Sequence, residues 1–173
     1  IDREIENAKA GKKESISIKI NNFSDPDTVF MLDRASQAGV KERLIVRSMF
    51  SLVTDDPEIS ENIRAISIVD GLLEHSRILR FSNCGDPVYY ISSADFLPRN
   101  FDTRVEVMCP IESADLRAEL DSYLRLQWGD SEKARLLDGD LNNELFVPSK
   151  KRRVGNSQAA IHGWLRKMAL GGE

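Results

Sequence analysis

The chain has 173 residues, 41% of them apolar and 30% charged, and its 28 acidic residues against 24 lysines and arginines give a net charge of −4. This composition is typical of a globular domain with its own core, and it argues against a disordered chain and against general affinity for nucleic acid or anionic membranes. No stretch approaches the roughly 20 apolar residues of a membrane helix. Cys84 and Cys109 lack metal-ligand spacing, which favours a reducing, cytoplasmic setting.

The hydrophobic pattern along the first 111 residues predicts an α/β fold. It indicates a helix over 1–10, a strand over 14–21 in which isoleucines alternate with polar residues, and a helix over 26–39 that begins after the capping residue Asp25. A near-continuous apolar run at 43–49 predicts a strand buried on both faces. Further strands are predicted at 64–70, 77–82, 87–93 and 104–110. This order indicates a mixed β-sheet flanked by helices.

The pattern changes after Pro110. Residues 112–129 and 157–169 have helical spacing, with the basic loop 147–156 between them. We therefore predict an α/β domain over 1–111 and a helical extension over 112–173 that packs on the same domain. The chain opens on a charged segment without Met, and we expect it to be part of a longer protein.

Polar residues gather at the ends of the predicted strands. Arg47 closes the most apolar strand, and His75 and Arg77 precede a later one. The segment after the strand at 87–93 adds Asp95, Arg99, Asn100 and Arg104. Ligands of open α/β sheets bind at the carboxyl ends of strands, guanidinium groups pair with phosphate oxygens, and histidine exchanges a proton near neutral pH. The arrangement therefore predicts a phosphate-binding site.

Simpler interpretations remain open from the residues alone. A single histidine beside apolar residues is more often a structural hydrogen-bonding group, and arginines at strand ends often pair with surface acids. The basic run 150–153 is typical of a solvated loop, with a polyanion contact as the alternative. The sequence contains no Walker loop, no G-x-G-x-x-G and no zinc-ligand spacing, so we expect no metal ligand among its residues.

A family resemblance bears on these residues. His75-x-Arg77, followed after a strand by the segment ending in Asn100, resembles a degenerate form of the phospholipase D signature, H-x-K with a later Gly-Ser and Asn. The chain is more similar still to the bacterial polyphosphate kinase family. The similar segments are IDREIENAKAGKK, ASQAGVKERLIVRSMFSL, SENIRAISIVDGLLEHSRILRFSN and YYISSADFLPRNFDTRVEVMCPI. They cover residues 1 to about 111, and the tail fits the family more loosely.

The resemblance implies a phospholipase-D-like α/β half of a multidomain kinase. That kinase moves the terminal phosphate of ATP reversibly onto inorganic polyphosphate, through a phosphohistidine in an upstream domain. By this resemblance His75 is catalytic, and Arg47 and His75 contact ATP. The resemblance ranks five further residues below these two, as expected support for the substrate phosphates: Arg77, Asp95, Arg99, Asn100 and Arg104.

The resemblance also sets expectations about cofactors and partners. ATP or ADP is the nucleotide, and magnesium is held mainly by the upstream domain. Partners are inorganic polyphosphate, the upstream domains and a second copy in a homo-oligomer, with no nucleic acid. A peripheral association of the parent enzyme with membranes is left open. Two other functions stay open for the chain itself: a non-catalytic binding or assembly module, and a phospholipase-D-like phosphodiesterase.

Overall fold

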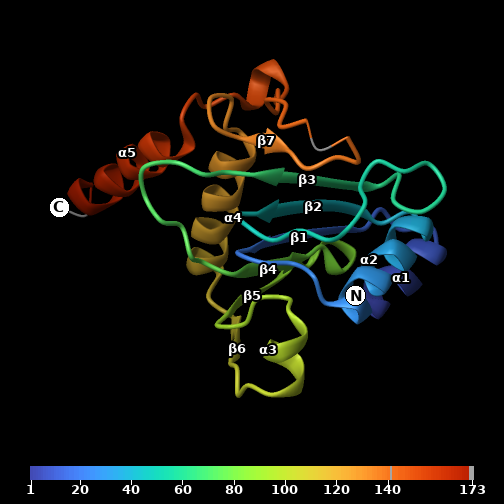
Figure 1. Ribbon diagram of the computed structural model, residues 1–173. Coiled ribbons are helices and arrows are strands. Elements are labelled where there is room, and N and C mark those ends of the chain that lie inside the picture. The colour runs from blue at the N-terminus through green and yellow to red at the C-terminus, as the bar shows by residue number, and fades with distance from the viewer. Residues whose placement is uncertain (141, 172–173) are drawn as a thin grey trace.

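The computed structural model describes residues 1–140 and 142–171, and over these it shows one sheet of seven strands in the order β6-β5-β4-β1-β2-β3-β7, flanked by helices (Figure 1). β1, β2 and β3 are parallel, and the other pairs are antiparallel. The strands are β1 Ser15–Ile20, β2 Lys41–Val46, β3 Ile63–Ser67, β4 Ile78–Phe81, β5 Val88–Ser92, β6 Met108–Ile111 and β7 Arg135–Leu136. The helices are α1 Asp2–Lys9, α2 Pro26–Gln37, α3 Pro98–Asp102, α4 Ala114–Trp128 and α5 Ser157–Leu170, with 3-10 turns at Asn83–Gly85 and Lys150–Arg152. The predicted mixed sheet flanked by helices is confirmed.

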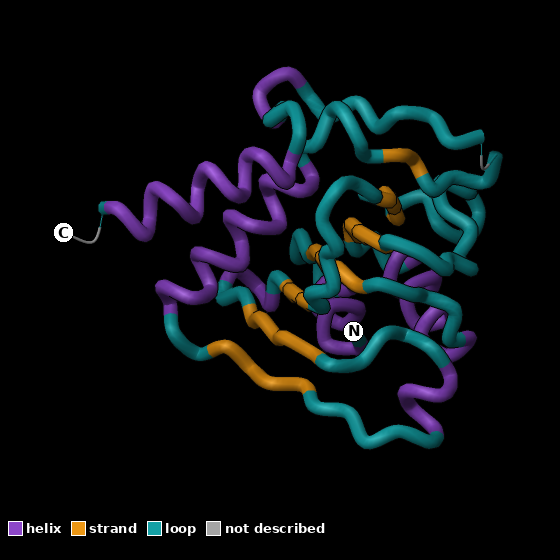
Figure 2. Tube along the Cα trace, turned by 60° about the vertical axis from the view of Figure 1, so that its left-hand side comes forward, coloured by secondary structure: helices purple, strands orange, loops and turns teal. Residues whose placement is uncertain are grey.

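Each face of the sheet has its own hydrophobic core. On one face, Ile16 and Ile18 of β1 pack with Ile5 of α1 and Leu32 of α2. On the other face, a separate cluster joins strand residues to α4 and the loops near β7; its buried members are Ile45, Ile66, Ile68, Ile78, Leu124, Ala134 and Phe146. Figure 2 shows α4 and α5 on one side of the strands and α1 and α2 on the other. The alternation of strand side chains between faces produces this division.

The predicted start and end of α2 are confirmed by its caps. Asp25 Oδ2 accepts a hydrogen bond of 2.9 Å from the amide of Thr28, and Pro26 occupies the first helical turn. Gly39 follows with φ of +91°, a conformation that glycine adopts without steric cost. The short connection to β2 depends on this reversal.

Three local predictions were wrong or incomplete. The strand predicted at 104–110 begins only at Met108, and Val105 before it is 100% exposed. Neither α3 nor β7 was predicted, because five and two residues are too few to show a periodic pattern. β7 extends the sheet beside β3, so the segment after 112 adds a strand as well as helices.

Two further features bear on the expected setting of the chain. Cys84 and Cys109 are both exposed and unpaired. Across residues 1–140 and 142–171, no helix has the length and apolar character needed to cross a membrane.

Candidate functional site

Strand register brings the main predicted residues to one edge of the sheet. β1 and β2 are parallel, with Ile20 opposite Val46 at their carboxyl ends. β4 runs antiparallel to β1 and begins at this edge, and β5 ends there. Arg47 follows β2, Arg77 precedes β4 and Asp95 follows β5. Segments up to 74 residues apart in sequence therefore meet at the predicted ligand edge.

Asp95 is the centre of the cluster. Its carboxylate accepts hydrogen bonds from Arg77 Nε at 3.0 Å and Arg77 Nη2 at 3.2 Å, from the Asn21 amide at 2.9 Å and from Asn22 Nδ2 at 2.8 Å. Burial alone would raise its pKa, but these donors outweigh burial and lower the pKa to about 2. Asp95 is therefore ionised at neutral pH and holds the Arg77 guanidinium in a fixed plane.

Arg77 in turn orients His75. Its Nη1 donates to the His75 carbonyl oxygen, and its Nη2 lies 3.1 Å from His75 Nε2. A guanidinium group only donates, so Nε2 is the acceptor and the neutral ring carries its proton on Nδ1 in this arrangement. The ring is exposed at the sheet edge. His75 thus offers an Nδ1–H donor to an incoming anion while Arg77 holds its other nitrogen.

Arg47 lies beside this group on the carboxyl end of β2. Its Nε donates to Asn21 Oδ1, and its carbonyl oxygen accepts a hydrogen bond of 3.2 Å from Ser67 Oγ. Within residues 1–140 and 142–171, no side chain takes up its two Nη groups. Asn21 contacts both Arg47 and Asp95, so Arg47 and Arg77 are linked through Asn21 and Asp95.

An aromatic cluster supports the loops that carry these residues. Phe23 packs against Phe50 and Phe96 with ring centroids 6.1 and 5.6 Å apart, and all three rings follow strand ends. Backbone hydrogen bonds join the same loops, since the amides of Ser24 and Asp25 both donate to the Phe96 carbonyl oxygen. Phe23 is fully buried. The polar cluster thus rests on a rigid apolar base.

A buried polar network supports the His75 segment from the α4 side. Lys19 of β1 is 2% exposed, donates to the Ser76 carbonyl oxygen at 3.3 Å and lies 3.8 Å from a Glu74 oxygen. Tyr123 of α4 is hydrogen-bonded to Ser76 Oγ and Glu74. Burial, opposed by Glu74 and assisted by the charges of Arg47 and Arg77, lowers the pKa of Lys19 to about 8. The network fixes the backbone on both sides of His75.

The other predicted residues lie outside the hydrogen-bonded cluster. Arg99 on α3 and Arg104 after it are exposed, and neither joins Asp95. Asn100 is 6% exposed, and its Nδ2 donates to Glu106. Hydrogen bonds from Ser93 and Asn100 lower the pKa of Glu106, and Arg77 is close enough to contribute. Asn100 therefore serves the loop around Glu106 in this structure.

Several residues of the cluster were missed from the sequence. Asn21 and Asn22 directly follow β1, so the argument that selected Arg47 applies equally to them. Lys19 alternates with buried isoleucines and has the pattern of a solvent-facing lysine, so no local signal marks it as buried. Glu74 and Tyr123 meet only through the packing of α4, which the sequence does not show.

The cluster does not suit a magnesium ion. Both Asp95 oxygens accept hydrogen bonds from arginine and asparagine groups, and both Glu106 oxygens accept bonds from Ser93 and Asn100. In the part of the chain that the structure describes, no group of three histidine, cysteine or carboxylate side chains could hold a metal ion. Magnesium prefers free carboxylate oxygens, whereas those of Asp95 and Glu106 already accept hydrogen bonds.

Comparisons with known proteins identify the chain's relatives. A family model for polyphosphate kinase C-terminal domain 2 matches residues 1–158. The chain belongs to this family. A curated member, the polyphosphate kinase of Vibrio vulnificus (strain YJ016), is 46% identical over 168 residues, which cover 97% of this chain and 24% of the relative. Both sequence matches thus assign this chain to the C-terminal part of polyphosphate kinases.

Solved structures agree with this assignment. The crystal structure of polyphosphate kinase from Porphyromonas gingivalis matches 96% of this chain with a TM-score of 0.91 and 42% identity, and the match covers 26% of that chain. A phospholipase D family member, Nuc from Salmonella typhimurium, matches 79% of this chain with a TM-score of 0.56. Its 13% identity shows a shared fold alone. The chain therefore spans only about a quarter of the polyphosphate kinases it matches.

Proposed function

We propose that this chain is the C-terminal part of a kinase that reversibly transfers the terminal phosphate of ATP to inorganic polyphosphate. The observation that carries the proposal is the convergence of Arg47, His75 and Arg77 at one sheet edge, with Asp95 neutralising only part of their charge. Such a cluster suits the oxygens of a transferring phosphoryl group. Membership of the polyphosphate kinase family supports the same substrates.

Each side chain has a distinct role in the proposal. Arg47 directs its Nη groups at ATP phosphate oxygens and offsets charge that develops on the phosphoryl group. His75 donates its Nδ1–H to the phosphate chain at the leaving oxygen, while Arg77 and Asp95 hold the ring in place. In the weaker part of the proposal, Arg99, Asn100 and Arg104 assist the polyphosphate from the α3 segment.

The nucleophile belongs to the missing part of the parent chain. A histidine nitrogen upstream forms a bond to the terminal phosphorus of ATP, and ADP leaves with the electrons of the broken P–O bond. The phosphoryl group then passes to the terminal oxygen of polyphosphate. Magnesium accompanying ATP would be held mainly by the nucleotide phosphates and the upstream domain, since the carboxylates of Asp95 and Glu106 are already engaged, and it would neutralise phosphate charge there.

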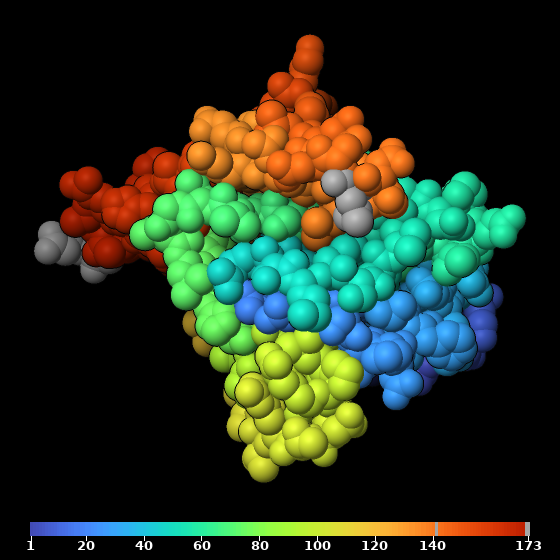
Figure 3. All heavy atoms as spheres, in the orientation of Figure 1, coloured from blue at the N-terminus to red at the C-terminus, as the bar shows by residue number. Residues whose placement is uncertain are grey.

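Exposed apolar side chains next to the edge support a covering domain. Leu72 and Leu73, beside His75, are 67% and 70% exposed, and Phe101 and Val107 are exposed on the segment around α3. Figure 3 shows this segment, in yellow, projecting from the body of the molecule. Apolar surface of this kind marks contact regions. We propose that the upstream domain packs here and completes the site.

The remaining expectations join the proposal. We propose that residues 1–111 and 112–173 form one domain, because α4 and β7 pack on the sheet of the first segment. We also propose that the parent works in the cytoplasm as a homo-oligomer, with ATP, polyphosphate and its upstream domains as partners. Its two exposed, unpaired cysteines suit a reducing compartment.

The two histidines of the chain provide a matched test. His75→Ala in the full-length protein is expected to lower the rate of ADP formation from ATP and polyphosphate on the order of a hundredfold, as does loss of other transition-state donors. His162→Ala, at an exposed position of α5, is expected to leave the rate unchanged. Equal rates for the two variants would remove His75 from the mechanism.

A further inference from the structure

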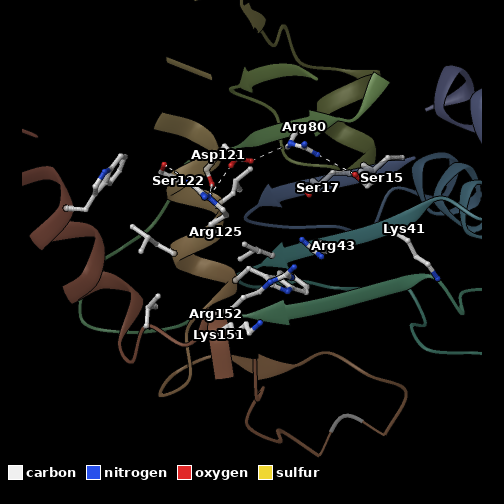
Figure 4. Close-up of a pocket in the computed structure, with 18 residues that line it drawn as sticks. Ser15, Ser17, Lys41, Arg43, Arg80, Asp121, Ser122, Arg125, Lys151 and Arg152 are labelled. Atoms are coloured by element: carbon white, nitrogen blue, oxygen red, sulfur yellow. Dashed lines mark hydrogen bonds and ion pairs between the residues drawn. The ribbon is translucent and has the colours of Figure 1, made fainter. Parts of the chain in front are cut away.

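A second charged feature lies on the α4 face of the sheet. A cavity of about 740 Å³ opens between the amino-terminal half of the central strands, α4, α5 and the 150–153 turn (Figure 4). Its polar lining comprises Lys41, Arg43, Arg80, Arg125, Lys151, Arg152, Asp121, Ser15, Ser17 and Ser122. None of the residues of the Arg47–His75 edge lines it. Arg43 precedes Arg47 by four residues of β2 and its extension, a separation of about 13 Å at the rise of a strand.

The floor of this cavity contains two arginines, Arg43 of β2 and Arg80 of β4, on the two strands that flank β1. In the pairing register, Ser17 of β1 lies opposite Arg43 of β2 and Arg80 of β4, and Arg43 lies opposite Arg64 of β3. Like charges directly opposite each other weaken a sheet. Arg64 lies outside the cavity, where its Nε forms an ion pair with Asp55 Oδ1 at 3.9 Å. The small Ser17 side chain leaves room above the floor, so the two arginines border open space.

The cavity carries far more positive than negative charge. Six of its lining residues are lysine or arginine, and Asp121 is its one carboxylate among residues 1–140 and 142–171. Asp121 is shared between Arg80 at 3.6 Å and Arg125 at 3.1 Å (Figure 4). Within the same residues, no carboxylate pairs with Arg43 or Arg152. Burial, and after it the charges of Arg152, Arg80 and Arg64, lower the pKa of Arg43.

The volume of the cavity and its other lining residues indicate which class of ligand fits. A cavity of this volume holds a molecule of nucleotide size. Arg43 lies over the ring of Trp128, 5.8 Å from its centroid, and this contact fixes the guanidinium plane. The lining also contains Arg152 from the turn and Arg80 from β4, and Arg80 is held at the rim by Tyr89 and Asp121 (Figure 4). Fixed guanidinium groups with adjacent serine hydroxyls match the oxygens of phosphate groups.

We propose that this cavity binds a multiply phosphorylated anion, either a nucleotide or a short inorganic polyphosphate chain. The two ligands share the chemistry that the arginines recognise. The proposal is independent of catalysis at the Arg47–His75 edge, because it rests on different side chains. It gives the basic run 150–153 a polyanion-binding role through Lys151 and Arg152.

Isothermal titration calorimetry of the full-length protein tests the proposal, with inorganic tripolyphosphate and ATP as separate probes. Arg43→Gln with Arg152→Gln removes two cavity charges and keeps polar side chains. Lys12→Gln with Lys13→Gln is the matched control, since both lysines are exposed in the loop before β1. The Arg47–His75 edge is intact in the cavity variant, so the second binding event is the one expected to weaken, on the order of a hundredfold for at least one probe, because each charge-assisted contact is worth roughly tenfold. The control is expected to bind both probes like the wild type.

The two probes separate the ligand sources. If the cavity variant binds only tripolyphosphate more weakly, the ligand of the cavity is an inorganic phosphate chain. If it also binds ATP more weakly, the cavity accepts any linear phosphate ester or anhydride. Unchanged binding of both probes by the cavity variant overturns the proposal, as does an equal loss in the control. An octaglutamate peptide that binds the cavity where neither phosphate probe does would also overturn it, in favour of an acidic protein segment. Arg152→Gln alone, on an exposed turn, repeats the test if the double variant melts at a lower temperature.

Discussion

Asp95→Asn tests the electrostatic centre of the candidate site. The change keeps the size of the side chain but removes the charge that Arg77 contacts through two hydrogen bonds. The pKa of Asp95 is lowered from 3.8 to about 2, and each unit corresponds to about 1.4 kcal/mol, so the ionised form contributes roughly 2 kcal/mol to the free energy of unfolding at neutral pH. The side chain is only 7% exposed, which limits screening by solvent.

The loss on substitution is expected to exceed this contribution. Arg77, 15% exposed, would remain without its counter-ion, and breaking a buried pair typically costs about 3–5 kcal/mol. The pKa of Asp95 is lower in the folded than in the unfolded chain, so its stabilisation is present above about pH 4 and disappears as the pH falls through about 2. The difference between wild type and variant should therefore shrink over this interval.

Urea denaturation of the chain, followed by tryptophan fluorescence at pH 7 and at several values below pH 4, measures both effects. Asp102→Asn, at an exposed position at the end of α3, is a matched control and should change the free energy of unfolding by less than about 0.5 kcal/mol. An Asp95→Asn variant as stable as wild type at pH 7 would refute the reasoning. A difference that stays constant down to pH 2 would refute its electrostatic cause.

Two further buried groups give predictions of opposite kinds. Glu42 is 1% exposed, and burial, with a contribution from Asp33, raises its pKa to about 9. Because the folded chain then holds a proton that the unfolded chain has released, the free energy of unfolding should fall as the pH rises from about 5 to 9. Glu42→Gln should abolish that slope and raise the free energy of unfolding at pH 7.5 by about 2 kcal/mol or more in urea titrations; an unchanged slope would contradict this. Lys19 has a pKa of about 8 beside the site, so kcat/KM of the full-length kinase should decline as the pH rises through 8 and the lysine loses its charge. Lys19→Met should lack this limb of the pH profile, and a variant that keeps it would assign the titration to another group.

The sequence predicted what depends on local pattern. Alternating isoleucines indicated β1, and Asp25 with Pro26 indicated the start of α2. Polar residues after strands predicted that Arg47 and Asp95 lie at one edge, where Asn21 contacts both. The sheet edge needed only the rule that ligands bind at carboxyl ends of strands. These inferences succeed because each follows from residues within one element or from a general property of the fold class.

Features that depend on register or on packing between distant elements could not be predicted. Arg80, Arg43 and Arg64 lie in one row only because the four strands β4, β1, β2 and β3 pair in this register, which the sequence does not state. Lys19 is buried beside Glu74, whose carboxylate also accepts a hydrogen bond from Tyr123 of α4, a packing that the sequence does not show. Long-range packing thus determined both the support of His75 and the second charged cavity.

The rate of ADP formation by the full-length protein after Arg47→Ala tests the central claim most directly. Arg47 follows β2 at the ligand edge with both Nη groups available, whereas Arg166, at an exposed position of α5, provides a matched arginine away from the edge. The account predicts that Arg47→Ala lowers kcat/KM for ATP with polyphosphate on the order of a hundredfold and that Arg166→Ala leaves it unchanged. An Arg47→Ala enzyme as fast as wild type would contradict it.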